Sequence, residues 1–276
     1  MFPVPPGPPP GVFPGLRAVR LRAGFCCFAP VLESAAVSPV HSPQDEGLPD
    51  RCGRRRLCSA RYEREARRQG WLRIAGVDEA GRGALFGPVV AAAVILDPRR
   101  RIVGLDDSKR LPVARREVLA VRIKQRALAW AVAVVEADRI DAWNIYQASR
   151  QAMAEAVRSL AVPPDYLLVD AVTLELPIEQ RSLIHGDARS VSIAAASILA
   201  KVTRDALMVE WDARYPQYGL ARNKGYATPD HLAALQRYGP TPLHRFSFAP
   251  VRSAQCWSAS ACQPPLPLPV QENEPG

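Results

Sequence analysis

Short apolar runs alternate with amphipathic segments along the middle of the 276-residue chain. Four runs rich in valine, alanine and leucine predict buried strands, over residues 72–78, 88–96, 129–137 and 165–171. Apolar residues at helical spacing and helix-start signals predict helices over residues 138–160, 190–214 and 229–238, with a further helix from near Pro112. Strands mixed with helices in one stretch predict a single three-layer α/β domain.

Both ends of the chain differ from this middle part in composition. Of the 27 prolines, 11 fall in the first 50 residues and five in the last 24. We therefore divide the chain into a proline- and arginine-rich leader (1–70), a folded domain (71–252) and a tail (253–276), and expect leader and tail to be disordered. The second half of the charged segment 51–68 could form a helix. The leader is a nucleic-acid-binding arm, a solvated extension, or upstream sequence included by a mis-assigned start codon; the sequence leaves these interpretations open.

Composition and charge exclude several classes of protein. No apolar run approaches the ~20 residues of a membrane-spanning helix, and the apolar stretch near the N-terminus is too interrupted for a secretory signal. All six cysteines lie in the flanks at spacings unlike those of zinc sites, so neither a disulfide framework nor structural zinc is expected in the folded domain. We expect a cytoplasmic monomer with no membrane association. The net charge of +9, from 36 Lys and Arg against 27 Asp and Glu, favours a polyanionic partner.

Acidic residues stand at the ends of two predicted strands. Asp78, followed at once by Glu79, ends the first strand, Asp170 ends the fourth, and Asp187 precedes the long alanine-rich helix. Functional groups gather at the carboxyl ends of strands in such sheets, so these carboxylates are expected to converge and to repel one another unless a cation lies between them. Oxygen ligands suit Mg²⁺ or Mn²⁺, and an acidic metal pocket in a basic protein is the charge pattern of a nuclease. Taken singly, each acid could equally be an N-cap or a surface carboxylate.

A glycine-rich turn follows the first pair of acids. It contains Gly81, Gly83 and Gly87, with Arg82 between the first two. The turn lacks the last glycine of a GxGxxG fingerprint and leads into a strand rather than a helix, which disfavours dinucleotide binding. Its backbone can instead come very close to a sugar or a phosphate.

Seven segments together resemble a known family. In chain order they are GVDEAGRG…GPVVAAAVIL, LDDSKRL, LLVDAVTL, GDARSVSIAAASILAKVTRD, PQYG, NKGYATPDH and HRFSFAPV. From about residue 74 to residue 251 they are similar to bacterial ribonuclease HII in content and order. The resemblance implies a ribonuclease H-like three-layer fold, a mixed sheet flanked by helices, with a small helical C-terminal portion. It also implies an endoribonuclease that cleaves the RNA strand of RNA–DNA hybrids and incises 5′ of single ribonucleotides in duplex DNA, leaving a 3′-hydroxyl and a 5′-phosphate.

The same resemblance implies roles for individual residues. The family's four catalytic carboxylates fall on Asp78, Glu79, Asp170 and Asp187, which would hold two Mg²⁺ or Mn²⁺ ions at the scissile phosphate. The remaining residues carried over are expected to bind substrate: Gly81, Arg82 and Gly83 through their backbone at the ribose 2′-hydroxyl, Tyr226 by stacking on the next sugar, and Lys109, Ser192 or Ser197, Lys201 and Lys224 at phosphates. Tyr226 could also be an ordinary half-buried tyrosine, and Lys201 could simply face solvent.

Two alternatives to this function remain. The chain could be a hybrid-binding protein that has lost catalysis, although all four expected carboxylates are present. It could also have the specificity of the sister family, ribonuclease HIII. The leader does not look like the N-terminal domain of that family, and aspartate at position 187 also favours ribonuclease HII. Of the other residues, His185 and His244 are expected to be structural or exposed, and Trp130, Trp143 and Trp211 to belong to the core.

Overall fold

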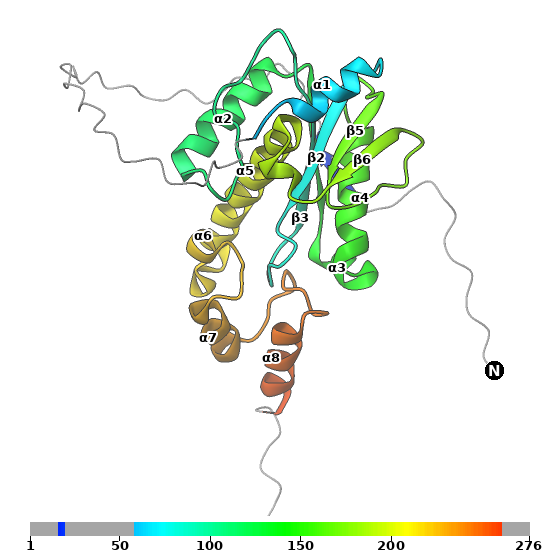
Figure 1. The fold of residues 1–276 in the computed structure, drawn as a ribbon. Coiled ribbons are helices and arrows are strands. Elements are labelled where there is room, and N and C mark those ends of the chain that lie inside the picture. The colour runs from blue at the N-terminus through cyan, green and yellow to red at the C-terminus, as the bar shows by residue number, and fades with distance from the viewer. Residues whose placement is uncertain (1–15, 20–57, 261–276) are drawn as a thin grey trace, which may run out of the picture.

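The computed structural model describes residues 16–19 and 58–260, which form one sheet between two layers of helices (Figure 1). The strands are β1 (Leu16–Val19), β2 (Ile74–Ala80), β3 (Val89–Ile95), β4 (Ala129–Val135), β5 (Tyr166–Asp170) and β6 (Glu179–Leu183). The helices are α1 (Arg61–Arg68), α2 (Val113–Arg126), α3 (Ala137–Trp143), α4 (Ile145–Arg158), α5 (Val191–Arg214), α6 (Leu220–Asn223), α7 (Pro229–Tyr238) and α8 (Ala249–Ser260). Two short 3₁₀ turns, η1 (Gly186–Ala188) and η2 (Pro216–Tyr218), flank α5. In the part of the chain that the structure describes, no helix is long and apolar enough to cross a membrane.

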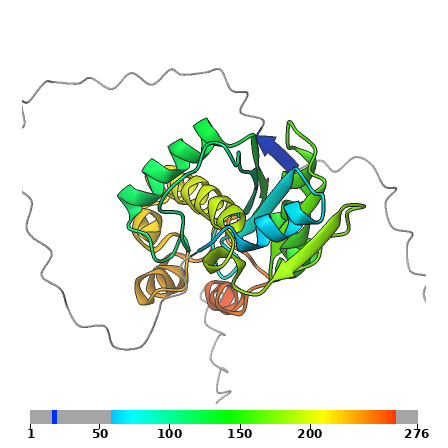
Figure 2. The ribbon, with the colours of Figure 1, turned by 45° about the horizontal axis from the view of Figure 1, so that its top comes forward.

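The sheet is mixed, with the strand order β1-β4-β3-β2-β5-β6. The pairs β1–β4, β4–β3 and β3–β2 are antiparallel, whereas the pairs β2–β5 and β5–β6 are parallel. Figure 2 shows β1, in dark blue, at the edge of this sheet. The four strands predicted from apolar runs are confirmed, as is the three-layer α/β architecture. The edge strands β1 and β6 were not predicted.

Two hydrophobic layers explain why the central strands are apolar along their whole length. Every residue of β3 is buried, because one set of alternate side chains faces α3 and α4 and the other faces α2 and α5. On the first face Met153 and Ile140 are fully buried, and on the second face Leu119 and Ile198 are fully buried. Trp130 and Trp143 are partly buried against these two layers, in agreement with their predicted place in the core.

Helix α5 is seated unusually close to β2. Its N-cap is Ser190, whose side chain accepts a hydrogen bond from the backbone N–H of Ile193 at 3.2 Å. A Cβ added to Gly76 of β2 would lie 2.0 Å from the backbone carbon of Ser192. Only glycine therefore allows the helix backbone to rest directly on the strand, and the alanine-rich sequence of α5 permits the same approach over the following turns.

Helix α1 belongs to the folded unit, although it lies inside the predicted leader 1–70. Its presence agrees with the helix expected in the second half of the charged segment. Tyr62 and Ala66 are buried against β2, β5 and α5. The buried carboxylate of Glu63 accepts hydrogen bonds from the hydroxyl of Ser190 at 2.6 Å and from the backbone N–H of Ser192 at 2.9 Å. Two further elements differ from the predicted disorder: β1 lies inside the leader, and α8 continues to Ser260, into the tail predicted from residue 253. For residues 1–15, 20–57 and 261–276 the predicted disorder lies outside the described residues.

The C-terminal portion is helical, as the resemblance implied. The end of α5, η2, α6, α7 and α8 enclose a third cluster of buried side chains around Phe86. The aromatic rings of Trp211 and Tyr215 contact Phe86 edge-on, with centroids 6.5 and 6.0 Å away. Leu85 and Phe86, which lie between Gly83 and Gly87, belong to this cluster, so the cluster anchors the glycine-rich turn.

Candidate active site

The sheet brings Asp78 and Asp170 to the same level on neighbouring parallel strands. Val77 of β2 is the register partner of Val169 of β5, and in each strand the aspartate is the next residue. The sequence therefore folds these acids together because an apolar run leads into an aspartate on each of two strands that pair in this register. Glu79 follows on β2, and its backbone N–H donates to Asp78 Oδ1 at 2.8 Å.

A short turn after β6 adds Asp187 to this group. The backbone N–H of Gly186 donates to Asp170 Oδ1 at 2.7 Å, which ties the turn η1 to the end of β5. A Cβ on Gly186 would lie 2.5 Å from Ile193 Cδ1 and 3.2 Å from Asp170 Oδ1, so no larger residue fits there. Asp187 is buried, and its Oδ1 accepts from the backbone N–H of Ala188 at 2.9 Å.

The carboxylates interact strongly with one another. Burial raises the pKa of Asp78 well above its ordinary value, and the charges of Glu79 and Asp170 raise it further. Burial also raises the pKa of Glu79 against the opposing effect of Arg82, and the charge of Asp170 adds to the increase. The pKa of Asp170 is raised by burial and by Asp187, although the hydrogen bond from Gly186 partly offsets this. The site thus concentrates negative charge that only a cation can neutralise without protonation.

Two basic side chains approach this group of acids. Arg82 Nη1 lies 3.3 Å from Glu79 Oε1, and Lys109 Nζ lies 3.5 Å from Asp187 Oδ2. Burial by itself would lower the pKa of Lys109, but the acids around it, Asp187 foremost, raise it overall. The Lys109 side chain is 79% exposed and arrives from the loop between β3 and α2, so it can move without disturbing the core.

The donor set fits a hard divalent cation. Four carboxylates supply oxygen ligands of the kind that Mg²⁺ and Mn²⁺ prefer, and Glu79 Oε2 is a buried oxygen without a hydrogen-bond partner among the described residues. Within residues 58–254, no three His, Cys, Asp or Glu side chains are grouped tightly enough to hold an ion in their present conformations. Binding of metal therefore requires side-chain rotations of these carboxylates, with Arg82 and Lys109 giving up their ion pairs.

The glycine-rich turn is locked to the C-terminal portion by two buried arginines. Arg204 of α5 donates to the carbonyls of Pro88 at 3.1 Å, Phe86 at 3.0 Å and Lys224 at 2.8 Å. Arg245 donates to the carbonyls of Gly87 at 2.9 Å and Arg82 at 2.9 Å. Burial lowers the pKa of both guanidinium groups, that of Arg245 to about 9. Sequence reasoning missed both residues, although each lies inside a segment that carries the family resemblance.

Gly81 and Gly83 serve this turn in different ways. Gly81 has a φ of +93°, and a Cβ there would lie 2.0 Å from Arg204 Nε, so the position requires glycine for both conformation and space. A Cβ on Gly83 would meet nothing nearer than Tyr226 Cε1, at 4.0 Å. The backbone at Gly83 thus faces the Tyr226 ring, which is 36% exposed, and a side chain at Gly83 would occupy the space between them.

Tyr226 is held both through its ring and through its backbone. The guanidinium of Arg204 lies 5.4 Å from the ring centroid, and Lys201 Nζ lies 5.9 Å from it. The Tyr226 carbonyl is hydrogen-bonded to His231 Nδ1 at 2.9 Å, and His231 Nε2 lies 3.2 Å from His244 Nε2. His231 and His244 are fully buried, so His244 is structural, as expected, whereas His185 is exposed.

The remaining predicted phosphate ligands fall into different places. Ser197 lies beside the acids: it is buried, its hydroxyl lies 2.9 Å from the hydroxyl of Ser108, and its proximity opposes the rise in the pKa of Asp78. Ser192 does not join them; it is buried at the start of α5 beside Gly76. Lys201 donates to Asp205 Oδ1 at 2.7 Å, and Lys224 has a left-handed backbone with a φ of 53°.

Helices on both faces of a mixed sheet, with acids at the ends of two adjacent parallel strands, define a ribonuclease H-like hydrolase. Residues 75–251 match the family described as Ribonuclease HII. A Ribonuclease HII of Solibacter usitatus (strain Ellin6076) is 61% identical over 196 residues, which cover 71% of this chain and 86% of that protein. The chain belongs to the ribonuclease HII family, and its resemblance to that family over these motifs is confirmed.

Solved structures agree with this assignment. The ribonuclease H2 from Pyrococcus horikoshii OT3 is 27% identical, with a TM-score of 0.59 over 67% of this chain and 97% of that chain. Bst-RNase HIII in complex with Mn²⁺ shares the fold, with a TM-score of 0.54 over 67% of this chain and 70% of that chain at 23% identity. The protein is thus a type 2 ribonuclease H, a metal-dependent hydrolase with ribonuclease H activity on RNA–DNA hybrids.

Proposed function

We propose that this ribonuclease H also incises duplex DNA on the 5′ side of a single embedded ribonucleotide, with two divalent ions held by Asp78, Glu79, Asp170 and Asp187. The observation that carries the proposal is the place of the Gly81–Gly83 turn. The turn starts directly after the acids of β2, and its backbone faces the exposed ring of Tyr226. A group that recognises a ribose would thereby lie next to the groups that support hydrolysis.

The chemistry of incision divides between the metal ions and the chain. When bound, the ions would polarise the phosphate, assist deprotonation of water and stabilise the departing oxygen. The carboxylates would hold them, and the backbone N–H groups of Gly186 and Glu79 hydrogen-bond one oxygen each of Asp170 and Asp78. Water adds to phosphorus, the bond from phosphorus to the 3′-oxygen of the preceding nucleotide breaks, and that oxygen takes up a proton. The products are a 3′-hydroxyl and a 5′-phosphate on the ribonucleotide.

Recognition of the ribonucleotide would use backbone and ring together. The 2′-hydroxyl is the group by which a protein distinguishes RNA from DNA. Peptide groups of Gly81, Arg82 and Gly83 can hydrogen-bond that hydroxyl, because no side chain at either glycine blocks their approach. The Tyr226 ring would stack on the sugar of the following deoxynucleotide. The bonds from Arg245 to the Arg82 carbonyl and from Arg204 to the Lys224 carbonyl keep the turn and the tyrosine at a fixed separation.

Phosphate contacts would position the duplex without reading its sequence. Lys109 is the best placed, since its exposed ammonium lies beside Asp187. Lys201 and Lys224 lie on the Tyr226 side, where they would contact phosphates beyond the junction. The hydroxyl of Ser197 already pairs with that of Ser108 beside Asp78, so we assign it to the surroundings of Asp78 rather than to direct phosphate binding.

A duplex with one embedded ribonucleotide tests the proposal directly. Incubated with Mg²⁺ or Mn²⁺, the protein is expected to cut once, 5′ of the ribonucleotide, and the Tyr226→Ala variant to lose this cut much more than cleavage of a continuous hybrid. Cleavage of the hybrid alone would instead assign ribonuclease HIII-like specificity. Binding of both duplexes without any cleavage would favour the hybrid-binding alternative and contradict the proposed chemistry.

A further inference from the structure

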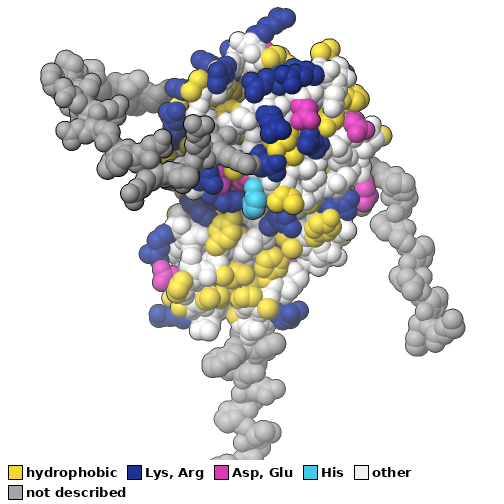
Figure 3. Space-filling model, in the orientation of Figure 1, with side chains coloured by type: hydrophobic (Ala, Val, Ile, Leu, Met, Phe, Trp, Pro, Cys, Tyr) yellow, Lys and Arg dark blue, Asp and Glu magenta, His cyan; other side chains and the backbone are white. Residues whose placement is uncertain are grey.

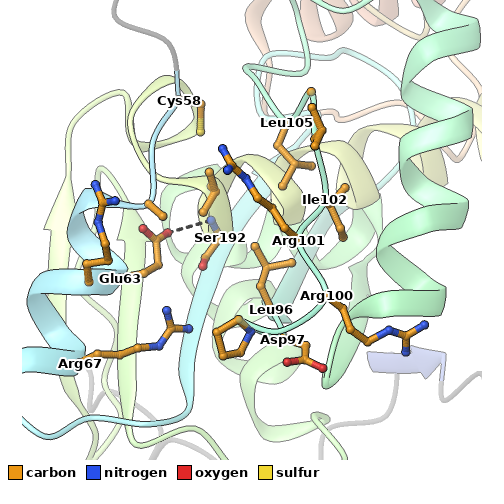
Figure 4. A pocket seen from close by; sticks show the side chains of 16 residues that line it. Cys58, Glu63, Arg67, Leu96, Asp97, Arg100, Arg101, Ile102, Leu105 and Ser192 are labelled. Carbon is orange, nitrogen blue, oxygen red and sulfur yellow. Dashed lines mark hydrogen bonds between the residues drawn. The ribbon is translucent and has the colours of Figure 1, made fainter.

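An arginine-lined hollow lies between α1 and the segment that follows β3 (Figure 4). Its volume is about 390 Å³. Arg64 and Arg67 of α1 line one wall, and Arg100 and Arg101 line the other. We refer to these four residues as the arginine hollow.

The four arginines lack acidic partners. None of them forms an ion pair with any carboxylate in the part of the chain that the structure describes. Two acids also line the hollow: Glu63 accepts from Ser190 and Ser192 through Oε1, while its buried Oε2 has no hydrogen-bond partner among the described residues, and Asp97 Oδ1 accepts from the backbone N–H of Arg99 at 2.9 Å. The four arginines still outnumber these acids. Arg67 points from α1 toward the opposite wall and Arg101 points back toward α1, whereas the Arg100 side chain points away from α1 (Figure 4). Like charges that face one another across a hollow are stabilised by an anion between them.

The floor of the hollow strengthens this preference. Ile102 and Leu105 are buried there, and Leu96 and Val191 are partly buried. An apolar floor lowers the local dielectric and so increases the attraction between a guanidinium and an anion at the same distance. Guanidinium groups match the oxygens of a phosphate in pairs, which favours phosphate over a simple halide.

Both walls of the hollow are connected to the catalytic site. On one side, the backbone N–H of Ser59, just before α1, donates to the carbonyl of Arg189 at 3.3 Å, two residues after Asp187. On the other side, the segment that carries Arg100 and Arg101 continues to Lys109, whose ammonium reaches Asp187. In the orientation of Figure 1, where α1 lies at the top, Lys and Arg side chains gather over the upper part of the visible face (Figure 3). A polyanion at the acids can therefore continue over positive charge.

We propose that the arginine hollow binds a backbone phosphate of the substrate duplex, away from the scissile position. The inference extends the proposed function by assigning a second point of attachment on the flanking duplex. Free nucleoside phosphates carry the same chemical group, so the test separates these two sources. A duplex is the occupant that the connection to Asp187 favours, because the hollow and the catalytic site then hold one continuous ligand.

The test is duplex binding by the double variant Arg64→Gln/Arg101→Gln, which removes one arginine from each wall. The matched control is Arg150→Gln/Arg158→Gln on α4, which removes the same charge from the opposite face of the sheet. Affinity for a fluorescent RNA–DNA duplex, with EDTA to prevent cleavage, is measured over a range of salt concentrations. We expect the hollow variant to bind ~10-fold more weakly than the control near physiological salt, with a salt slope smaller by about one to two.

Duplex length provides the second readout. On a duplex extending several base pairs beyond the cut on both sides the two double variants should differ, and on one cut back to the cleavage site they should bind equally. Equal affinities and salt slopes on the long duplex would overturn the inference. So would calorimetric binding of ATP or pyrophosphate by the wild type that the hollow variant loses while its duplex binding stays unchanged.

The result is independent of the specificity assigned above. Because binding is measured without cleavage, a loss of affinity in the hollow variant would support the hollow even if the protein did not incise at embedded ribonucleotides. Thermal unfolding of both double variants checks that the substitutions act on binding. Arg64 and Arg101 are exposed, so the hollow variant should unfold within a few degrees of the wild type. The Arg150 side chain is 18% exposed and donates to the Thr173 carbonyl at 3.1 Å, so the control variant is expected to lose more stability, which makes it the stricter comparison.

Discussion

The carboxylate site and the arginine-tied turn both bury charge, but they stabilise it in opposite ways. Asp78, Glu79 and Asp170 are buried next to one another, and burial together with mutual repulsion raises the pKa of each. Arg204 and Arg245 are buried against neutral backbone carbonyls: Arg204 donates to three of them and Arg245 to two, while Arg245 Nη2 has no partner among the described residues. The acids are thus left to be stabilised by what the protein binds, whereas the arginines are stabilised by the chain itself. The charges of the carboxylates are therefore available to a bound cation, whereas the charges of the two arginines hold backbone segments together.

The largest effect that distinguishes the two regions should come from Asp78→Asn. We expect cleavage of an RNA–DNA hybrid to fall by about 10³-fold or more, because a ligand for the metal ions is lost. Without metal, the same variant should be more stable than the wild type, because a neutral amide no longer repels Glu79 and Asp170. Single-turnover cleavage and urea unfolding in EDTA measure the two effects. Asp138→Asn, at an exposed position of α3, is the control and should change neither. A less stable Asp78→Asn protein would contradict the account of repulsion.

Removal of a buried arginine should affect stability instead. Arg204→Met leaves the carbonyls of Pro88, Phe86 and Lys224 without their donor, and we expect the free energy of unfolding to fall by about 3 kcal/mol or more. Arg204→Lys should lie in between, since an ammonium cannot reach three carbonyls in a fixed fork. Urea unfolding at neutral pH measures both, with exposed Arg158→Met as the comparison. If Arg204→Met were as stable as Arg158→Met, the turn would not depend on these bonds.

A pair of glycine substitutions separates backbone strain from steric fit at the turn. Gly70 and Gly81 both have a positive φ, +102° and +93°, but a Cβ at Gly70 would meet nothing within 4 Å. Gly70→Ala should therefore cost about 1 kcal/mol from strain alone. Gly81→Ala should cost about 2 kcal/mol or more, because its Cβ also displaces the Arg204 side chain. Equal losses in urea unfolding would show that Arg204 adjusts freely.

The effect that is smallest at neutral pH concerns the pH dependence of the histidine pair that holds the Tyr226 backbone. Burial lowers the pKa of His244 from 6.5 to about 3, with a further contribution from His231, whose own pKa burial also lowers. The unfolded chain therefore binds more protons than the folded protein between these pH values, so stability falls as pH drops below about 6.5. The slope attributable to one proton is about 1.4 kcal/mol per pH unit.

Urea unfolding between pH 4 and 7 tests this slope. His244→Gln should show a shallower dependence on pH than the wild type, whatever its stability at pH 7. His185→Gln, at an exposed position, should keep the slope of the wild type. An unchanged slope in His244→Gln would remove the histidine pair from the explanation of acid sensitivity.

Much of the fold could be predicted because its central strands are apolar on both faces. The apolar runs of β2 and β5 each lead into an aspartate, so the pattern that predicted these strands also predicted where the acids would meet. Strand β6, with the sequence EQRSL, lies at the edge of the sheet and is mostly exposed, so its composition carries little signal. The described part of the leader also departs from expectation, since α1 packs on the sheet through Tyr62 and Ala66.

The parts of the site that could not be predicted depend on distant contacts. Arginine is seldom fully buried, and nothing local marks Arg204 or Arg245 as ligands of carbonyls more than 100 residues away in sequence. Ser192 and Ser197 lie in the same helix and motif, and only the seating of α5 shows that Ser197 reaches Asp78 whereas Ser192 borders the arginine hollow.

Because α5 packs directly on Gly76, the position of this one helix determines where several residues of the proposed binding surface lie relative to one another. Ser192 in its first turn lines the arginine hollow, Ser197 lies beside Asp78, and Arg204 hydrogen-bonds the segment that follows the glycine-rich turn. These three residues lie along one helix, and the contact between Gly76 and Ser192 fixes the position of that helix on the sheet. A residue inserted into α5, or a side chain introduced at Gly76, would therefore shift flanking contact, catalysis and sugar recognition out of alignment together.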